Sequence, residues 1–180
     1  MDPESTLCPC RLARWRDLPT VRRLHRACFP HPYSIWRLAG FLASGQSWVW
    51  LAERHGAAIG YVILSASSYP QPSRLVGEII SLGVLPAGRR AGVGRQLLQT
   101  ALAQTEHDGL GEVYLQVAVD NQAAQALYTA AGFGRLRTLR AYYVDGQDAW
   151  LMRRPPAPPE PETPPFSPPW PDSSRTRPPA

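Results

Sequence analysis

The chain has no lysine. Its 19 basic side chains are all arginine, and they outnumber the 14 acidic residues to give a net charge of +5. The arginines are spread from Arg11 to Arg177, whereas a nucleic-acid-binding face would gather them with aromatic residues between. Because no such cluster is present, we expect no nucleic-acid partner.

Cysteine is also scarce, since only Cys8, Cys10 and Cys28 occur in 180 residues. An odd, sparse set cannot form a disulfide framework, and its spacing fits no common zinc motif even with His25 or His31 added. No apolar run reaches the roughly 18–20 residues that span a bilayer, and the first residues lack a secretory signal. We therefore expect a cytoplasmic protein without a metal or a membrane partner.

Proline is abundant at one end only, because twelve of the 20 prolines follow Met152. The composition predicts one folded domain at residues 1–154 and a proline-rich disordered tail at residues 155–180. The PxxP spacings of the tail fit a ligand for aromatic grooves or, more simply, a solvated spacer.

Hydrophobic periodicity divides the first half of the domain into short elements. It predicts a strand at residues 7–12, a helix capped by Asp17, and a second helix after Ser34. Strands at residues 48–53 and 58–66 flank a tight His55-Gly56 turn, and residues 67–74 are predicted as a loop.

The second half alternates strands and helices. A strand at residues 75–84 leads through a glycine-rich turn into a helix, and a strand at 112–119 leads into a helix at 122–131 that Gly132 ends. Strands at residues 133–143 and 149–153 flank Asp145-Gly146, a strong hairpin signal. The order βααβββαβαββ predicts an α/β fold with a mixed sheet and helices on both faces.

The sharpest motif is Arg-Arg-Ala-Gly-Val-Gly at residues 89–94, between a strand and a helix. Its glycines let backbone N–H groups and the positive helix end face a diphosphate, while the arginines add charge. A P-loop would need glycine-lysine-serine here, and a Rossmann motif would need glycine in place of Leu97. A plain glycine turn entering a helix remains the alternative.

In this context the sequence resembles the GNAT superfamily of acetyl-CoA-dependent N-acetyltransferases, whose pyrophosphate loop reads Q/R-x-x-G-x-G/A. The resemblance continues in N-x-x-A-x-x-L-Y at residues 121–128 and in Gly132-Phe133, and it covers about residues 8–155. The pattern of residues 142–152 is most similar to the RimI-type ribosomal-protein-alanine N-acetyltransferases. Phe29-Pro30-x-x-Tyr33 resembles the loop by which protein N-terminal acetyltransferases hold a peptide.

The resemblance implies the GNAT acyl-CoA N-acyltransferase fold, with acetyl-CoA as cosubstrate and a protein N-terminus as acceptor. The residues implied for the pyrophosphate are Arg89, Arg90, Ala91, Gly92, Val93, Gly94 and Arg95. Those implied for the pantetheine arm are the backbone of Leu82, Gly83 and Val84, and the side chain of Asn121. Those implied for the acceptor peptide are Phe29, Pro30, Tyr33, Tyr142 and Tyr143.

The resemblance also implies catalytic roles. Tyr128 matches the tyrosine that protonates the leaving thiolate. Gln116 stands where RimI has its catalytic glutamate, and an amide cannot accept a proton near neutral pH, so Glu78 is the base that we predict. Plainer roles are a core tyrosine for Tyr128, a solvated carboxylate for Glu78, and a helix cap for Asn121.

The missing glutamate bears on the acceptor. An α-amine has a pKa of about 7.7–8.0 and a lysine side chain one of about 10.4, so the α-amine needs the weaker base. The sequence therefore predicts an N-terminal acetyltransferase, with which a monomer is compatible. Two alternatives are a GNAT enzyme acting on a small amine, such as an antibiotic or polyamine, and a catalytically silent acyl-CoA-binding scaffold.

Overall fold

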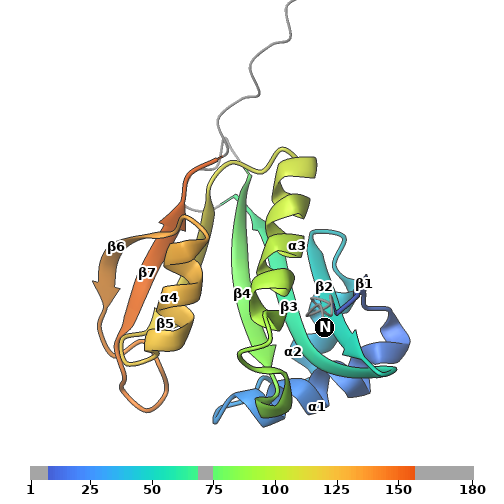
Figure 1. Cartoon of the computed structure of the whole chain (residues 1–180). Helices are drawn as coiled ribbons and strands as arrows, with labels where there is room; N and C mark the ends of the chain where they lie inside the picture. Colours follow the sequence, from blue (N-terminus) through green and yellow to red (C-terminus); the bar gives the residue numbers. More distant parts are fainter. Residues whose placement is uncertain (1–7, 69–74, 157–180) are drawn as a thin grey trace, which may run out of the picture.

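A computed structural model describes residues 8–68 and 75–156 of the chain. In this part, seven strands form one mixed sheet in the order β1-β2-β3-β4-β5-β7-β6 (Figure 1). The strands are β1 (Cys10–Leu12), β2 (Ser47–Arg54), β3 (Ala57–Ser67), β4 (Val76–Val84), β5 (Val113–Ala118), β6 (Gly134–Leu139) and β7 (Ala149–Arg154). The helices are α1 (Leu18–Cys28), α2 (Ile35–Ala43), α3 (Val93–His107) and α4 (Gln122–Ala130).

The predicted order βααβββαβαββ is confirmed, and two short 3₁₀ helices, η1 (Trp15–Asp17) and η2 (Pro86–Gly88), are added to it. Most of the predicted loop at residues 67–74 lies outside the described residues. So does the predicted tail, apart from Pro155 and Pro156.

Helices cover both faces of the sheet, as predicted. On one face, Leu97 and Leu98 of α3 and Tyr128 of α4 pack in one core cluster with Val62 and Leu64 of β3. On the other face, α1 and α2 join a second cluster through buried residues that include Val21, Leu24, Leu38, Tyr61 and Ile63. Alternate residues of β3 thus serve the two cores, as a strand buried on both sides requires.

The turns follow the sequence closely in the first half. His55 and Gly56 both have positive φ, +51° and +74°, which is the backbone of a tight hairpin turn between β2 and β3. Ser34 caps α2 by accepting a hydrogen bond from the Arg37 N–H at 3.2 Å. These two predictions are confirmed.

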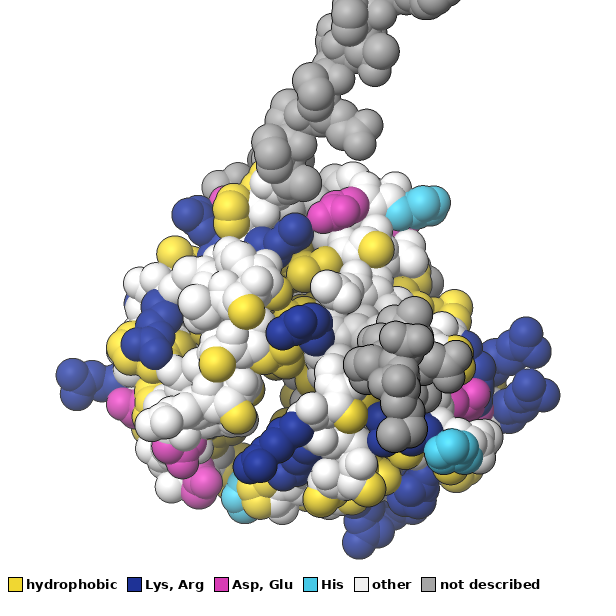
Figure 2. Space-filling view, viewed as in Figure 1, with side chains coloured by type: hydrophobic (Ala, Val, Ile, Leu, Met, Phe, Trp, Pro, Cys, Tyr) yellow, Lys and Arg dark blue, Asp and Glu magenta, His cyan; other side chains and the backbone are white. Residues whose placement is uncertain are grey.

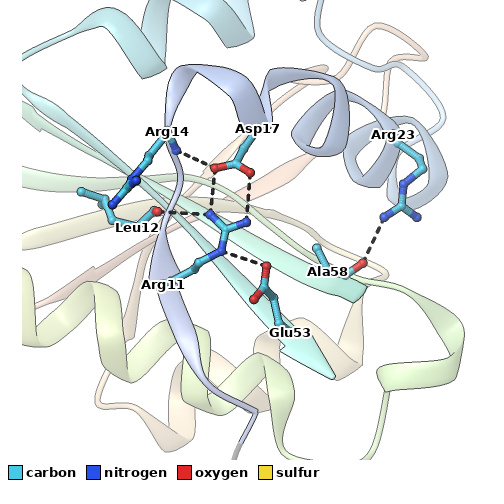
Figure 3. Close-up of polar contacts among 7 residues, drawn as sticks. All are labelled: Arg11, Leu12, Arg14, Asp17, Arg23, Glu53 and Ala58. Atoms are coloured by element: carbon cyan, nitrogen blue, oxygen red, sulfur yellow. Dashed lines mark hydrogen bonds and ion pairs between the residues drawn. The ribbon is translucent and has the colours of Figure 1, made fainter. Parts of the chain in front are cut away.

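Asp17 is the N-cap residue of α1, as predicted, but its side chain forms no capping hydrogen bond with that helix. Its carboxylate turns back and accepts two hydrogen bonds from the Arg11 guanidinium, at 2.8 and 2.9 Å, and one from the Arg14 N–H at 2.8 Å. Arg11 also donates to Glu53 of β2 at 2.8 Å (Figure 3). A bidentate pair with a charged fork outweighs a single cap to a backbone amide.

The last hairpin is shorter than predicted. β6 ends at Leu139, and residues 140–148 form a loop rather than an extension of the strand. The loop closes on itself, because the Ala141 N–H donates to Asp148 Oδ1 at 2.8 Å and the Tyr143 N–H donates to the Gln147 carbonyl at 3.0 Å. Gly146 provides the positive φ, +83°, within this loop.

The described residues contain neither a membrane-spanning helix nor a metal-binding cluster. No helix combines the length and the apolar character that crossing a bilayer requires. No group of three or more histidine, cysteine, aspartate or glutamate side chains is arranged to hold a metal ion.

Candidate active site

The candidate site lies where β4 and β5 separate. These parallel strands pair only at residues 77–79 and 113–115. Beyond these residues, in the part of the chain that the structure describes, β4 pairs only with β3 and β5 only with β7. The surface is hollowed at this place between the two halves of the molecule (Figure 2).

A bulge contributes to the separation. Ile63 of β3 pairs with Ser81 and Leu64 pairs with Ile79, so Ile80 is an extra residue in β4. Bulges bend a strand and increase its twist, which here leads the end of β4 away from β5. Leu82, Gly83 and Val84 follow the bulge, and their backbone edge faces the slot, where an extended ligand with amide groups can hydrogen-bond.

The glycine-rich turn lies at the end of this slot. Gly92 begins α3 with φ +76° and no side chain to cap it, and Arg90 has φ +59°. Val93 is buried in the core, whereas Ala91 and the three arginines, Arg89, Arg90 and Arg95, are exposed. Uncapped N–H groups of a 15-residue helix among exposed arginines form an environment that favours an anion such as a diphosphate.

The turn is held against both walls of the slot. Arg89 Nε donates to the Val84 carbonyl at 3.1 Å, which ties the turn to the end of β4. Gly94 faces α4, because a Cβ at that position would lie 3.5 Å from Leu127 Cδ2 and 3.9 Å from Leu82 Cδ2. The predicted pyrophosphate residues therefore adjoin the predicted pantetheine strand.

Asn121 and Tyr128 belong to α4, on the other wall. Asn121 is the N-cap, with its Oδ1 accepting from the Ala124 N–H at 3.1 Å, so its plainer role as a cap is confirmed. Tyr128 is 7% exposed and packs edge-on against Phe133, with their ring centroids 5.8 Å apart. Burial raises the pKa of the Tyr128 hydroxyl, with a smaller contribution from Tyr143, so the group stays protonated near neutral pH.

Glu78 and Gln116 meet across the point of separation. Gln116 Nε2 donates to Glu78 Oε1 at 3.1 Å, and both side chains are half-buried. Val113, Leu115 and Val117 of β5 point into the core with α3 and α4, so Gln116 points to the opposite face. The pair lies at the base of the slot, on the face of the sheet that carries α1 and α2.

Aromatic side chains border this same face. Tyr33, in the loop between α1 and α2, stacks on His25 at 4.6 Å, and Phe29 stacks on the same ring at 4.8 Å. Tyr142 and Tyr143 of the β6–β7 loop pack edge-on at 5.1 Å.

The tyrosines of the two loops affect one another electrostatically. Burial raises the pKa of Tyr142, Tyr33 and Glu78 add to the rise, and Arg37 opposes it. Burial, with Tyr142 and Tyr33 adding to it, raises the pKa of Tyr143 to about 12. The structure thus brings Tyr33, Tyr142 and Tyr143 together near Glu78, while Pro30 is exposed in the α1–α2 loop.

Two residues of this region, Arg37 and His25, are not among the site residues predicted from the sequence. Arg37 lies over the Tyr33 ring with its Cζ 4.1 Å from the ring centroid. His25, which enters the sequence-based prediction only as a zinc ligand that the spacing does not support, is 2% exposed. The available signal was spacing, because His25 lies four residues before Phe29 and shares the buried face of α1 with Val21 and Leu24.

Known proteins share this chain's sequence and fold. A model of the acetyltransferase (GNAT) family matches residues 18–133. An N-alpha-acetyltransferase of Sulfurisphaera tokodaii is 35% identical over 152 residues, which cover 81% of this chain and 91% of that protein. The N-alpha-acetyltransferase RimI of Mycobacterium tuberculosis is 39% identical over 123 residues, covering 66% of this chain and 75% of that protein.

A solved structure agrees with these matches. The crystal structure of Chaetomium thermophilum Naa20 in complex with a bisubstrate analogue superposes with a TM-score of 0.72 at 26% identity, covering 82% of this chain and 86% of that one. The family match, a relative aligned over nine-tenths of its own length, and the shared fold show that this chain belongs to the GNAT family of acetyltransferases.

Proposed function

We propose that this acetyltransferase transfers the acetyl group of acetyl-CoA to the N-terminal α-amine of a protein. The observation that carries the proposal is the placement of the Glu78–Gln116 pair at the base of the slot between β4 and β5. The slot can receive the thioester from the side of α3 and α4. The face with Tyr33, Tyr142 and Tyr143 can receive an amine from the other side.

Acetyl-CoA would lie along the slot. Its pyrophosphate would accept hydrogen bonds at the turn of residues 89–95, and its pantetheine amides would pair with the backbone of residues 82–84. Asn121 caps the N-terminus of α4 and is exposed there, so it can also reach the pantetheine arm. The same backbone N–H groups of β4 would polarise the acetyl carbonyl.

The reaction would be a direct attack in a ternary complex. The neutral amine nitrogen forms a bond to the acetyl carbon, and its proton passes to Glu78, directly or through a water. The tetrahedral intermediate then breaks its carbon–sulfur bond, and the CoA thiolate takes a proton from Tyr128. The products are an N-acetylated peptide and CoA thiol.

The chemistry of the base supports an α-amine over a lysine. The two groups differ by about 2.5 pKa units, which corresponds to about 3.5 kcal/mol of deprotonation free energy. Gln116 can orient Glu78 by its hydrogen bond but cannot accept a proton. A carboxylate base without a second proton acceptor at Gln116 suits the acceptor that is already partly neutral near pH 7.

The similar proteins support the same proposal. Two of them are N-alpha-acetyltransferases, and the similar solved structure is a complex with a bisubstrate analogue. The proposal includes a cytoplasmic location, supported by the three cysteines, all of which are free.

The test is CoA release from acetyl-CoA by the purified full chain. Peptides with free N-termini would be compared with the same peptides acetylated at the N-terminus and retaining a lysine. We expect release only with free N-termini. Release with the blocked peptides would assign the acceptor to lysine. If neither peptide supports release, the proposal is rejected, whether or not small amines tested in the same assay do support it.

A further inference from the structure

A buried hydrogen-bond chain runs beneath the acetyl-binding strand. His25 Nδ1 of α1 is hydrogen-bonded to the Tyr61 hydroxyl of β3, and the same hydroxyl is 2.7 Å from Ser81 Oγ of β4. The exposed fractions are 2% for His25, 0% for Tyr61 and 7% for Ser81. Three elements far apart in the sequence are thus connected by side-chain bonds that water does not reach.

Each end of this chain adjoins a part of the candidate site. At one end, the His25 ring is stacked between Phe29 and Tyr33, so it supports the acceptor loop, residues 28–34. At the other end, Ser81 belongs to the bulge of β4, immediately before Leu82. The chain therefore joins the acceptor loop to the strand that would hold the acetyl group.

Packing around Gly83 reinforces the connection. A Cβ at Gly83 would lie 2.8 Å from Tyr61 Cε1 and 3.1 Å from both Cβ and Sγ of Cys28. The end of α1 and the Tyr61 ring therefore sit directly against the backbone of β4. The absence of a side chain at Gly83 makes this close approach possible.

The network is a poor choice for stability alone. His25 Nε2 is buried and has no hydrogen-bond partner in the described structure. Burial, with a contribution from Arg37, lowers the pKa of His25 to about 4, so the ring is neutral near pH 7. An unsatisfied buried polar atom destabilises the fold, and an apolar side chain of similar shape would avoid that penalty.

We propose that the His25–Tyr61–Ser81 chain is a positioning network for acetyl transfer, which sets the acceptor loop at a fixed distance from the acetyl-binding end of β4. The inference rests on the proposed function, since it assumes a peptide acceptor at residues 28–34. His25 makes both kinds of contact: its ring stacks with Phe29 and Tyr33 of the loop, and its Nδ1 is hydrogen-bonded to Tyr61 of β3, whose hydroxyl continues to β4.

Two substitutions break the connection to β4 and keep the ring stack. Tyr61→Phe removes the shared hydroxyl, and His25→Phe removes Nδ1 but leaves a ring between Phe29 and Tyr33. The matched control is Thr105→Val on α3, which removes another buried hydroxyl bond, to the Leu102 carbonyl at 2.7 Å, on the face of the sheet opposite α1. Melting temperatures of all variants would be recorded.

We expect Tyr61→Phe and His25→Phe each to raise the KM for the acceptor peptide about five- to tenfold, as the loss of one buried hydrogen bond permits. The KM for acetyl-CoA should change less than about twofold, because the turn of residues 89–95 is untouched. The double variant should be no worse than either single one, because both remove the same connection.

Hydrogen exchange provides a readout that needs no substrate. Amides of residues 28–34 should exchange faster in both variants and at the wild-type rate in Thr105→Val. If the wild type acetylates no peptide, the proposed function fails while this measurement still tests the connection. Unchanged exchange, additive KM effects, or KM changes that follow melting temperature in all variants would overturn the inference.

Discussion

At the scale of single residues, the proposed reaction rests on the pair formed by Glu78 and Gln116. Neither side chain stands out in the sequence of its own strand. The two are paired because β4 and β5 meet at residues 77–79 and 113–115 and then separate. Gln116 fixes one carboxylate oxygen, so the other is the atom that can face an incoming amine. Glu78 is therefore the group that we propose as the base.

Glu78→Gln is expected to lower kcat/KM for an acceptor peptide about 10²-fold, since a positioned general base contributes that much or more. The substitution keeps the size of the side chain, so Gln116 retains a hydrogen-bond partner. Activity should shift to higher pH, where the amine is already neutral. Initial rates of CoA release between pH 6 and 9 would measure both effects.

Glu106→Gln is the matched control for that experiment. Glu106 lies on α3, is half-exposed, and pairs with Arg154 at 3.2 Å, so the same chemical change should leave the rate near that of the wild type. Glu78→Gln with a wild-type rate at every pH would show that another group removes the proton.

At the scale of elements, β1 is attached to the fold by charge as well as by the sheet. Arg11 of β1 pairs with Asp17 at the end of η1 and with Glu53 of β2, both at 2.8 Å (Figure 3). Hydrogen bonds from Arg11, with a backbone bond from Arg14, lower the pKa of Asp17 to about 2 against the opposing effect of burial. The entry into α1 is therefore stabilised by a carboxylate that must stay ionised.

Asp17→Asn is expected to lower the free energy of unfolding by about 1–2 kcal/mol at pH 7, a range discounted for the partial exposure of Arg11. The folded-state pKa is below the unfolded value, so the stabilisation is present above about pH 4 and is lost as the pH falls towards 2. The difference between variant and wild type should then disappear. Urea unfolding at pH 7 and near pH 2 would measure it.

Asp108→Asn controls for removal of a carboxylate as such. Asp108 caps the end of α3 beside the exposed His107, where solvent screens the interaction, so the expected change in stability is small. Equal losses in the two variants at pH 7 would contradict the assigned role of Asp17.

At the scale of the whole molecule, the seven-stranded sheet has a core on each face, and the face with α1 and α2 contains the polar chain that begins at His25. The neutral, buried state of this histidine couples folding to pH. In the unfolded chain the ring would bind a proton near its ordinary pKa of 6.5, whereas in the fold the pKa is about 4.

The wild type is therefore expected to lose stability as the pH falls from 6.5 to 4, by about 1.4 kcal/mol per pH unit in that window from this one group. The sign follows from the unfolded state binding more protons there. His25→Phe should reduce the dependence of stability on pH between 6.5 and 4. It should leave the loss of stability between about pH 4 and 2, which is assigned to Asp17, unchanged. Melting temperature against pH measures both windows, and identical slopes in the two proteins would refute the assignment.

Local patterns in the sequence were sufficient for the order of elements, the His55-Gly56 turn and the glycine turn at residues 89–94. Each of these features depends on residues close together in the sequence, through the hydrophobic periodicity, the conformational freedom of glycine or helix capping. Such features can therefore be predicted from the sequence alone. The capping bond of Asp17 and the end of the strand predicted at residues 133–143 failed because side chains six and seven positions away, Arg11 and Asp148, bind the same groups.

The candidate site itself was a product of folding. Glu78 and Gln116 are 38 positions apart, and His25 and Tyr61 are 36 apart. The slot depends on a bulge at Ile80 that no local pattern announces. A sequence encodes what each segment prefers, but which backbone edges part and which side chains are buried together depends on strand register and packing between segments. Here that register converts two ordinary strands into the two walls of one site.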